Sequence, residues 1–175
     1  MQYVSITDIL TMPLFLNHED IAPVLPSLSS PEFPHAFAKT WIANWNARNV
    51  TAVLSHFRDD CSFESPIAEK VTGQACLDGK AQLRDYWERA LSGIKSLRFI
   101  LDDYVWDSAR RTLVVVYRSL VDGRVTCCTE LMVFDAAGHQ YIGKAYYGAV
   151  TTAQAAHAGS NSGKSARVPV REDFP

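Results

Sequence analysis

The sequence predicts an α+β fold in which helices pack on one face of a curved, antiparallel sheet. Two observations lead to this prediction. In the first half of the chain apolar residues recur at helical spacing, whereas the second half alternates in the manner of strands joined by short turns. Helices followed by an antiparallel meander form an α+β domain, because each layer buries its apolar side against the other. A length of 175 residues, 47% apolar and 21% charged, suits one globular domain.

Three helices are predicted before the meander. The first begins at Pro31 after a cap at Ser29 or Ser30, and it continues to about Arg48. The second is short, with an apolar stripe over 50–57. The third follows a cap at Asp78 and ends at Gly93, and its inner side carries Leu83, Tyr86, Trp87, Ala90 and Leu91.

The strands are predicted from alternation and from turn residues. A first strand over 61–65 follows a turn at Asp59-Asp60 and is stopped by Pro66, after which a loop runs to Asp78. The predicted meander comprises residues 96–106, 112–121, 124–134 and 139–148. Asp102 and Asp103 are ambiguous, because a bulge in the long strand 96–106 would change which of them points inward.

A two-residue turn fixes the register of the central hairpin. Asp122-Gly123 is typical of a type I′ turn, which places Val121 opposite Arg124 and Val115 opposite Glu130. One face then collects Leu113, Val115, Tyr117, Ser119, Thr126, Cys128, Glu130 and Met132. The other face, which holds Val114, Val116, Leu131 and Val133, is almost continuously apolar and must also be covered. Either the N-terminal segment or a second subunit covers it, and we expect a homodimer through this outer face.

Glu130 is the most informative residue of the first face. A carboxylate among apolar neighbours is costly unless it is paired, and its pKa tends to rise. Such a group is a candidate general acid or base. The alternative is a structural role, in which Glu130 forms an ion pair with an arginine or accepts from a backbone donor.

Composition narrows the partners and cofactors. The net charge of −2 supplies no basic surplus for nucleic acid, and no apolar stretch is long enough to span a membrane. The four cysteines have no metal-ligand spacing, and no glycine-rich phosphate loop is present. We therefore expect no cofactor and no metal. Because no secretory signal is recognisable, we expect a cytoplasmic protein.

The ends of the chain differ from its middle. The first thirty-odd residues are acidic and rich in proline, and they are interpreted as an extension over 1–33. Residues 151–175 are rich in Ala, Ser and Gly without periodicity, which predicts a flexible C-terminal tail. The domain itself is predicted over 34–150.

Residues 37–148 resemble the SnoaL-like branch of the nuclear transport factor 2-like superfamily. The resemblance is carried by the segments WIANWNARNVTAVLSHFRDDCSFESP and GKAQLRDYWERAL and by the hairpin that ends in CTELMVFDAAGHQYIGKAYYG. It implies a cone-shaped α+β barrel, in which three N-terminal helices pack on a strongly curved, mainly antiparallel sheet. It also implies a pocket between the helices and the sheet, and a dimer.

The resemblance also implies site residues when the isomerase-like members serve as the template. The carboxylic acid of the hairpin strand matches Glu130, the expected catalytic residue. The carboxylate base that such members carry before the strand-ending proline is replaced by Ser65, and the tyrosine of the first helix by Trp41. The complete set of expected substrate-binding residues is Trp41, Trp45, Phe63, Ser65, Trp87, Tyr117, Cys128, Met132 and Tyr147.

Two classes of function remain open from the sequence. The first is a cofactor-free acid/base enzyme, an isomerase, cyclase or dehydratase, that acts on a hydrophobic polyketide-, terpenoid- or steroid-like substrate. The second is a non-catalytic ligand-binding or dimerisation module of the same fold. The two classes differ in whether the carboxyl group of Glu130 faces an open cavity.

Overall fold

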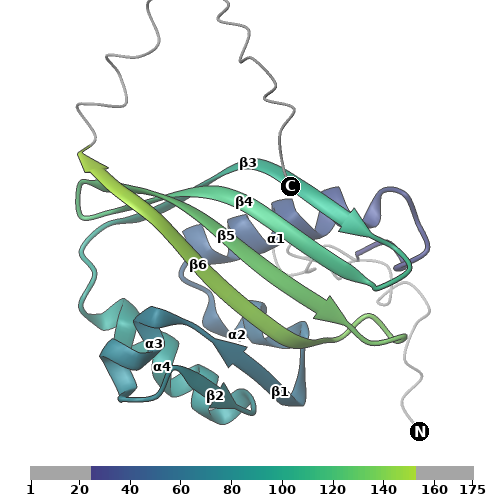
Figure 1. Ribbon diagram of the computed structural model, residues 1–175, viewed down its shortest axis with the longest axis horizontal. Coiled ribbons are helices and arrows are strands. Elements are labelled where there is room, and N and C mark those ends of the chain that lie inside the picture. Colours follow the sequence, from purple (N-terminus) through teal and green to yellow (C-terminus); the bar gives the residue numbers. More distant parts are fainter. Residues whose placement is uncertain (1–24, 153–175) are drawn as a thin grey trace, which may run out of the picture.

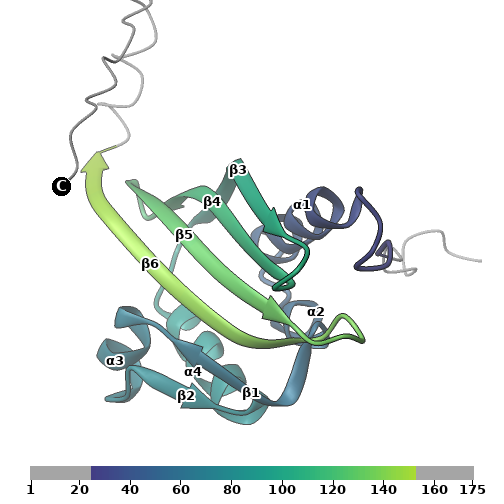
Figure 2. The same ribbon diagram turned by 45° about the vertical axis from the view of Figure 1, so that its right-hand side comes forward.

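The computed structural model describes residues 25–152, which form one six-stranded curved sheet with helices against one side (Figures 1 and 2). The helices are α1 (Phe33–Asn46), α2 (Val50–Ser55), α3 (Pro66–Thr72) and α4 (Lys80–Ser92). The strands are β1 (Phe57–Glu64), β2 (Cys76–Asp78), β3 (Leu97–Asp107), β4 (Thr112–Val121), β5 (Arg124–Phe134) and β6 (Gln140–Thr152). The predicted α+β class and the mainly antiparallel curved sheet are confirmed.

The sheet has the order β2-β1-β6-β5-β4-β3. All neighbours are antiparallel except β1 and β6, which run parallel. This parallel pair joins the first strand of the helical half to the last strand of the meander. The two halves of the chain therefore share one sheet, and α1, α2 and α4 lie against its inner side (Figure 2).

The central hairpin has the predicted register. Asp122 and Gly123 have φ values of 48° and 80°, as a type I′ turn requires, and Val121 pairs with Arg124. Val115 pairs with Glu130. Alternation then sends Cys127 to the exposed face and Cys128 to the buried face.

The first helix is shorter than predicted. It begins at Phe33, and the residue before it, Glu32, makes no side-chain cap, while Ser30 Oγ accepts from the backbone of Glu32. It ends at Asn46, two residues before the predicted end at about Arg48, and Asn49 caps α2 by accepting from Ala52 N at 2.9 Å.

The first strand and the following loop depart from the prediction. β1 begins at Phe57, so the predicted turn at Asp59-Asp60 is wrong. The cause is long-range pairing, since Phe57 lies opposite Gln140 of β6 and Gln140 N donates to His56 O. The predicted loop over 66–78 contains α3 and β2, and α3 ends at Gly73 with a left-handed φ of 83°.

The fourth helix starts two residues after the predicted cap. The residue before α4 is Gly79, which makes no side-chain cap, so the predicted cap at Asp78 is wrong, whereas the end at Gly93 is confirmed. In β3 a bulge lies between Leu101 and Asp103. Both Asp102 and Asp103 are consequently exposed, and Asp102 forms an ion pair of 2.8 Å with Arg118.

The outer face of the sheet has no helix of residues 25–152 packed on it (Figures 1 and 2). Its Val114, Val116, Leu131 and Val133 are partly buried, and Val105 at its edge is 62% exposed. The homodimer through this face stays a prediction. Residues 1–24 of the predicted extension over 1–33 and residues 153–175 of the predicted tail over 151–175 lie outside the described residues, and β6 continues to Thr152.

No helix within residues 25–152 is both long and apolar enough to cross a membrane.

Gly143 permits a close approach between β6 and a core ring. A Cβ atom at this position would lie 2.6 Å from Cδ2 of Phe63 and 2.9 Å from Nε2 of Gln140. We expect Gly143→Ala to displace the Phe63 ring and to lower the free energy of unfolding by about 1–3 kcal/mol in urea denaturation. The control is Gly93→Ala, whose Cβ would meet nothing closer than 3.9 Å, and equal stability of the two variants would contradict the prediction.

The predicted homodimer is tested by a charge on the outer face. Val116→Lys places an ammonium at the centre of this face, where a dimer would have to desolvate it. Sedimentation velocity should then show a dimer for the native protein and a monomer for the variant. Ala81→Lys, on the exposed side of α4, should remain dimeric. A monomeric native protein would refute the prediction.

Candidate functional site

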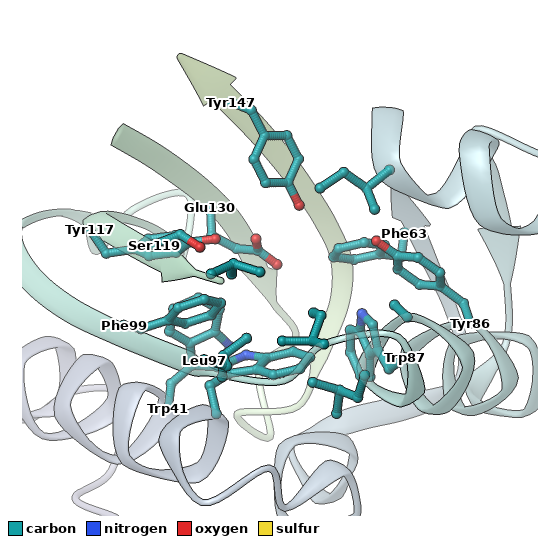
Figure 3. Close-up of a pocket in the computed structure, with 16 residues that line it drawn as sticks. Trp41, Phe63, Tyr86, Trp87, Leu97, Phe99, Tyr117, Ser119, Glu130 and Tyr147 are labelled. Atoms are coloured by element: carbon teal, nitrogen blue, oxygen red, sulfur yellow. The ribbon is translucent and has the colours of Figure 1, made fainter. Parts of the chain in front are cut away.

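A cavity of about 110 Å³ lies between the inner face of the sheet and helices α1 and α4 (Figure 3). Every element except α2 and β2 contributes to its lining. The lining residues are Trp41, Trp45, Phe63, Ile67, Tyr86, Trp87, Ala90, Leu91, Ile94, Leu97, Phe99, Tyr117, Ser119, Val121, Glu130 and Tyr147.

The wall that the helices contribute is aromatic. Trp41 and Trp45 are one helical turn apart on α1, and α4 supplies Trp87. The rings pack edge to face, with centroids 5.1 Å apart for Trp45 and Trp87 and 5.2 Å apart for Trp41 and Tyr117. Such contacts fix the ring positions, so this wall is preformed.

The wall that the sheet contributes carries four polar side chains. Glu130 comes from β5, Tyr117 and Ser119 come from β4, and Tyr147 comes from β6. In Figure 3 the carboxyl group of Glu130 and the hydroxyl of Tyr147 point into the same space. The helical side also carries two polar groups: the hydroxyl of Tyr86 from α4, and the indole Nε1–H of Trp45 from α1, which is buried without a hydrogen-bond partner in residues 25–152.

Glu130 is a buried carboxyl group without a protein partner. Its side chain is only 5% exposed, and it makes no hydrogen bond or ion pair with any residue of 25–152. Burial raises its pKa from 4.5 to about 8. The group is therefore largely protonated at neutral pH, and the alternative of an ion pair with an arginine is excluded within the described residues.

Hydroxyl groups lie around this carboxyl. Ser65 Oγ and Tyr86 Oη share a hydrogen bond of 3.5 Å, and the Tyr147 hydroxyl lies close to both. Burial raises the pKa of Tyr86 to about 12 and also raises the pKa values of Tyr117 and Tyr147, with the Glu130 charge adding to each shift. These phenols stay protonated and can donate hydrogen bonds at neutral pH.

Most of the residues predicted for the site line the cavity. They are Glu130, Trp41, Trp45, Phe63, Trp87, Tyr117 and Tyr147. The structure does not bring Ser65, Cys128 or Met132 to the lining. Ser65 is fully buried, and its Oγ accepts from Ile67 N as the cap of α3. Met132 is fully buried in the core, and Cys128 Sγ donates to Thr126 O.

Several lining residues were not predicted for the site. Tyr86 lies on the predicted inner side of α4, and Ser119 lies on the predicted inner face of β4. The periodicity of the sequence could therefore have identified both as lining residues. Phe99 and Leu97 belong to β3, whose register depends on the bulge at Asp102. Ile67 comes from α3, which was predicted as a loop.

No group of three or more His, Cys, Asp or Glu side chains within residues 25–152 is arranged to hold a metal ion.

Comparison with known proteins supports the fold. The model of the SnoaL-like domain matches residues 38–124, so the chain contains a SnoaL-like domain, and the resemblance found in the sequence is confirmed. A SnoaL-like protein of unknown function from Burkholderia thailandensis is 28% identical, with a TM-score of 0.61 over 69% of this chain and 98% of that chain.

Two more distant structures share the fold at low identity. The epoxide hydrolase/cyclase-like enzyme SalBIII, described in pyran ring formation in the polyether salinomycin, is 10% identical, with a TM-score of 0.55 over 68% of this chain and 95% of that chain. TerC, co-crystallised with polyporic acid, is 14% identical, with a TM-score of 0.56 over 71% of this chain and 96% of that chain. No curated protein matches the chain in sequence.

The raised pKa of Glu130 predicts how stability depends on pH. Between pH 4.5 and about 8, Glu130 holds a proton in the folded state that it releases in the unfolded state. The stability that this group contributes is therefore complete below pH 4.5 and is lost as the pH rises to about 8. Through Glu130 alone, the free energy of unfolding should fall by about 1.4 kcal/mol per pH unit across this window. Glu130→Gln lacks the titrating group. In urea denaturation, the free energy of unfolding of the variant should therefore rise relative to that of the native protein from pH 5 to pH 8.

The control for this experiment is Glu64→Gln. Glu64 is exposed on β1, where it pairs with Lys144 at 2.7 Å. Its substitution should leave the slope of stability against pH unchanged in this window. Parallel profiles for the native protein and Glu130→Gln would show that Glu130 does not titrate there.

Proposed function

We propose that this protein is a cofactor-free acid/base enzyme that isomerises, cyclises or dehydrates a hydrophobic substrate, with Glu130 as the catalytic residue. One observation carries the proposal: an unpaired, protonated carboxyl group lies in an aromatic cavity. A buried carboxyl without a partner costs stability, and such a cost is typical of functional sites.

The chemistry follows from the protonation state. Neutral Glu130 donates its proton to an oxygen of the substrate as negative charge builds on that oxygen or as its C–O bond breaks. The resulting carboxylate then accepts a proton from a substrate carbon or hydroxyl group, which restores the enzyme. Tyr117 and Tyr147 supply hydroxyl donors on the same wall, and donors placed towards developing charge stabilise it.

The structural neighbours support the class of reaction. SalBIII is described as epoxide hydrolase/cyclase-like, and ring closure onto an epoxide is a reaction that a general acid promotes. The aromatic wall favours a hydrophobic substrate, as is usual for pockets that bind small apolar molecules.

The second candidate, a binding module without chemistry, is favoured by one observation. Glu130 is the only carboxyl among the lining residues, and no histidine accompanies it. The lining therefore lacks the second titratable group that a reaction with separate acid and base groups requires. The two candidates predict different behaviour of a variant that keeps the shape of Glu130 and removes its proton transfer.

The test is turnover of three probe substrates that differ in the bond changed. They are a cyclic β-hydroxyketone for dehydration, a hydroxy-epoxide for ring closure and a β,γ-unsaturated cyclic ketone for isomerisation. We expect the native protein to convert at least one of them, and we expect Glu130→Gln to lose about 10²–10⁴-fold in kcat/KM, because proton transfer contributes that much. Circular dichroism should show that the fold is retained.

Glu64→Gln is the matched control, since it makes the same change on an exposed strand position and should keep full activity. Full activity of Glu130→Gln would exclude acid/base catalysis by this residue. Failure of the native protein to convert any of the three probes would favour the binding module.

A further inference from the structure

We propose that the indole N–H of Trp45 donates a hydrogen bond to the molecule bound in the cavity, and thereby selects substrates with an acceptor oxygen at the end remote from Glu130. The proton transfer proposed for Glu130 makes no use of this group. The inference rests on the proposed function and deepens it, because it names a specificity-determining residue on the opposite wall. It also narrows the substrate to a molecule that carries oxygen at both ends.

Trp45 carries a polar group that the protein leaves unsatisfied. Its side chain lines the cavity and is only 8% exposed, and its Nε1 atom is buried without a hydrogen-bond partner among residues 25–152. An indole nitrogen donates and cannot accept, so only an acceptor satisfies it. A buried donor without an acceptor costs stability, and a phenylalanine at this position would avoid that cost. A ligand that supplies the acceptor accounts for the indole.

The surroundings of Trp45 offer no acceptor of ordinary strength. The rings of Trp87, Phe99 and Trp41 pack around it, with centroids 5.1, 5.9 and 6.2 Å away. The face of such a ring accepts only weakly from an N–H group. The polar side chain next in sequence, Asn46, is already occupied, since its amide group donates to Phe99 O and accepts from Phe99 N. The acceptor for Trp45 therefore comes from a molecule that enters the cavity.

Trp45 and Glu130 belong to opposite walls of the cavity. Trp45 comes from α1 and Glu130 from β5. In Figure 3, Glu130 and Trp41, which is one helical turn before Trp45, lie on opposite sides of the cavity. A ligand with a single oxygen can place it at either wall, and only one of these orientations brings it to the proton of Glu130. A second acceptor oxygen satisfies both groups at once and holds the productive orientation.

Access to Trp45 depends on a neighbouring ring. Because its nitrogen is buried, an acceptor reaches it when one of the surrounding rings turns. Phe99 is the neighbour suited to this movement, since it is only partly buried and lies on β3, an edge strand of the sheet. Trp41 and Trp87 are 3% and 5% exposed and are held within the core. We therefore expect the ligand to displace the Phe99 ring as it binds.

The test compares two pairs of probes that differ by one oxygen. Tetrahydropyran-4-one has an ether oxygen opposite its carbonyl, where cyclohexanone has a methylene group, and 4-methoxycyclohexanone and 4-ethylcyclohexanone form a longer pair. In isothermal titration calorimetry, we expect the ether of at least one pair to bind the native protein about tenfold more tightly than its carbon counterpart, because it satisfies a buried donor. Trp45→Phe should lose this preference. Trp106→Phe, outside the lining, should keep it.

A spectroscopic readout separates the hydrogen bond from packing. The chain has four tryptophans, so the ¹⁵N-labelled protein gives four indole N–H signals, and Trp45→Phe assigns one of them. The preferred ether should move the Trp45 indole proton downfield, whereas its carbon counterpart should not, since neither probe carries an aromatic ring current. If Trp45→Phe does not fold, benzothienylalanine at position 45, with sulfur in place of the N–H group, keeps the ring shape and should lose the preference in the same way.

The outcomes separate this inference from the proposed function. Glu130→Gln keeps a donor on the sheet wall, so it should retain the ether preference although it loses turnover. A preference that depends on Trp45, in a native protein without turnover, would uphold the hydrogen bond and refute catalysis. Equal affinity within both pairs, a preference that survives the replacement of Trp45, or no binding of any of the four probes would overturn the inference and leave Glu130 catalysis open.

Discussion

The Asp122-Gly123 turn fixes the geometry on which the rest of the site depends. It sets the β4–β5 register, and a slip of one residue would move Glu130 from the inner face to the outer face of the sheet. The same aspartate also positions the start of β3, the neighbour of β4 in the sheet. Asp122 Oδ1 accepts from Lys95 N at 3.0 Å and from Ser96 N at 2.8 Å. One turn therefore positions both the carboxyl group and the start of β3, which carries part of the aromatic wall.

A second set of hydrogen bonds ties the helical wall to the sheet. Asn46, at the end of α1, donates to Phe99 O at 3.0 Å and accepts from Phe99 N at 2.6 Å. The guanidinium of Arg48 donates to the carbonyl oxygens of Ile94 and Lys95. These contacts hold the end of α1, the segment after α4 and the edge strand together at the entrance. The dimensions of the cavity are consequently set by hydrogen bonds between side chains and the backbone as well as by side-chain packing.

The sequence predicted what depends on local signals and missed what depends on distant partners. The type I′ turn placed Glu130 on the inner face, and helical spacing placed Trp41, Trp45 and Trp87 there. The start of β1 was wrong because its pairing with β6 joins Phe57 to Gln140, far apart in the chain. Ser65 was assigned to the substrate, whereas its neighbour Pro66 makes it the cap of a helix, a local signal that was interpreted as a strand end.

A single buried carboxyl group restricts the chemistry that the proposed function can include. After Glu130 gives up its proton, its carboxylate is left in the cavity with no cation among the lining residues. Burial then favours the return of a proton, and it does so most easily from the substrate that has just been activated. Reactions that take and return one proton within a single turnover, such as isomerisation or ring closure, satisfy this constraint. A reaction that must retain a separate ionised base throughout does not, which is consistent with serine rather than a carboxylate at position 65.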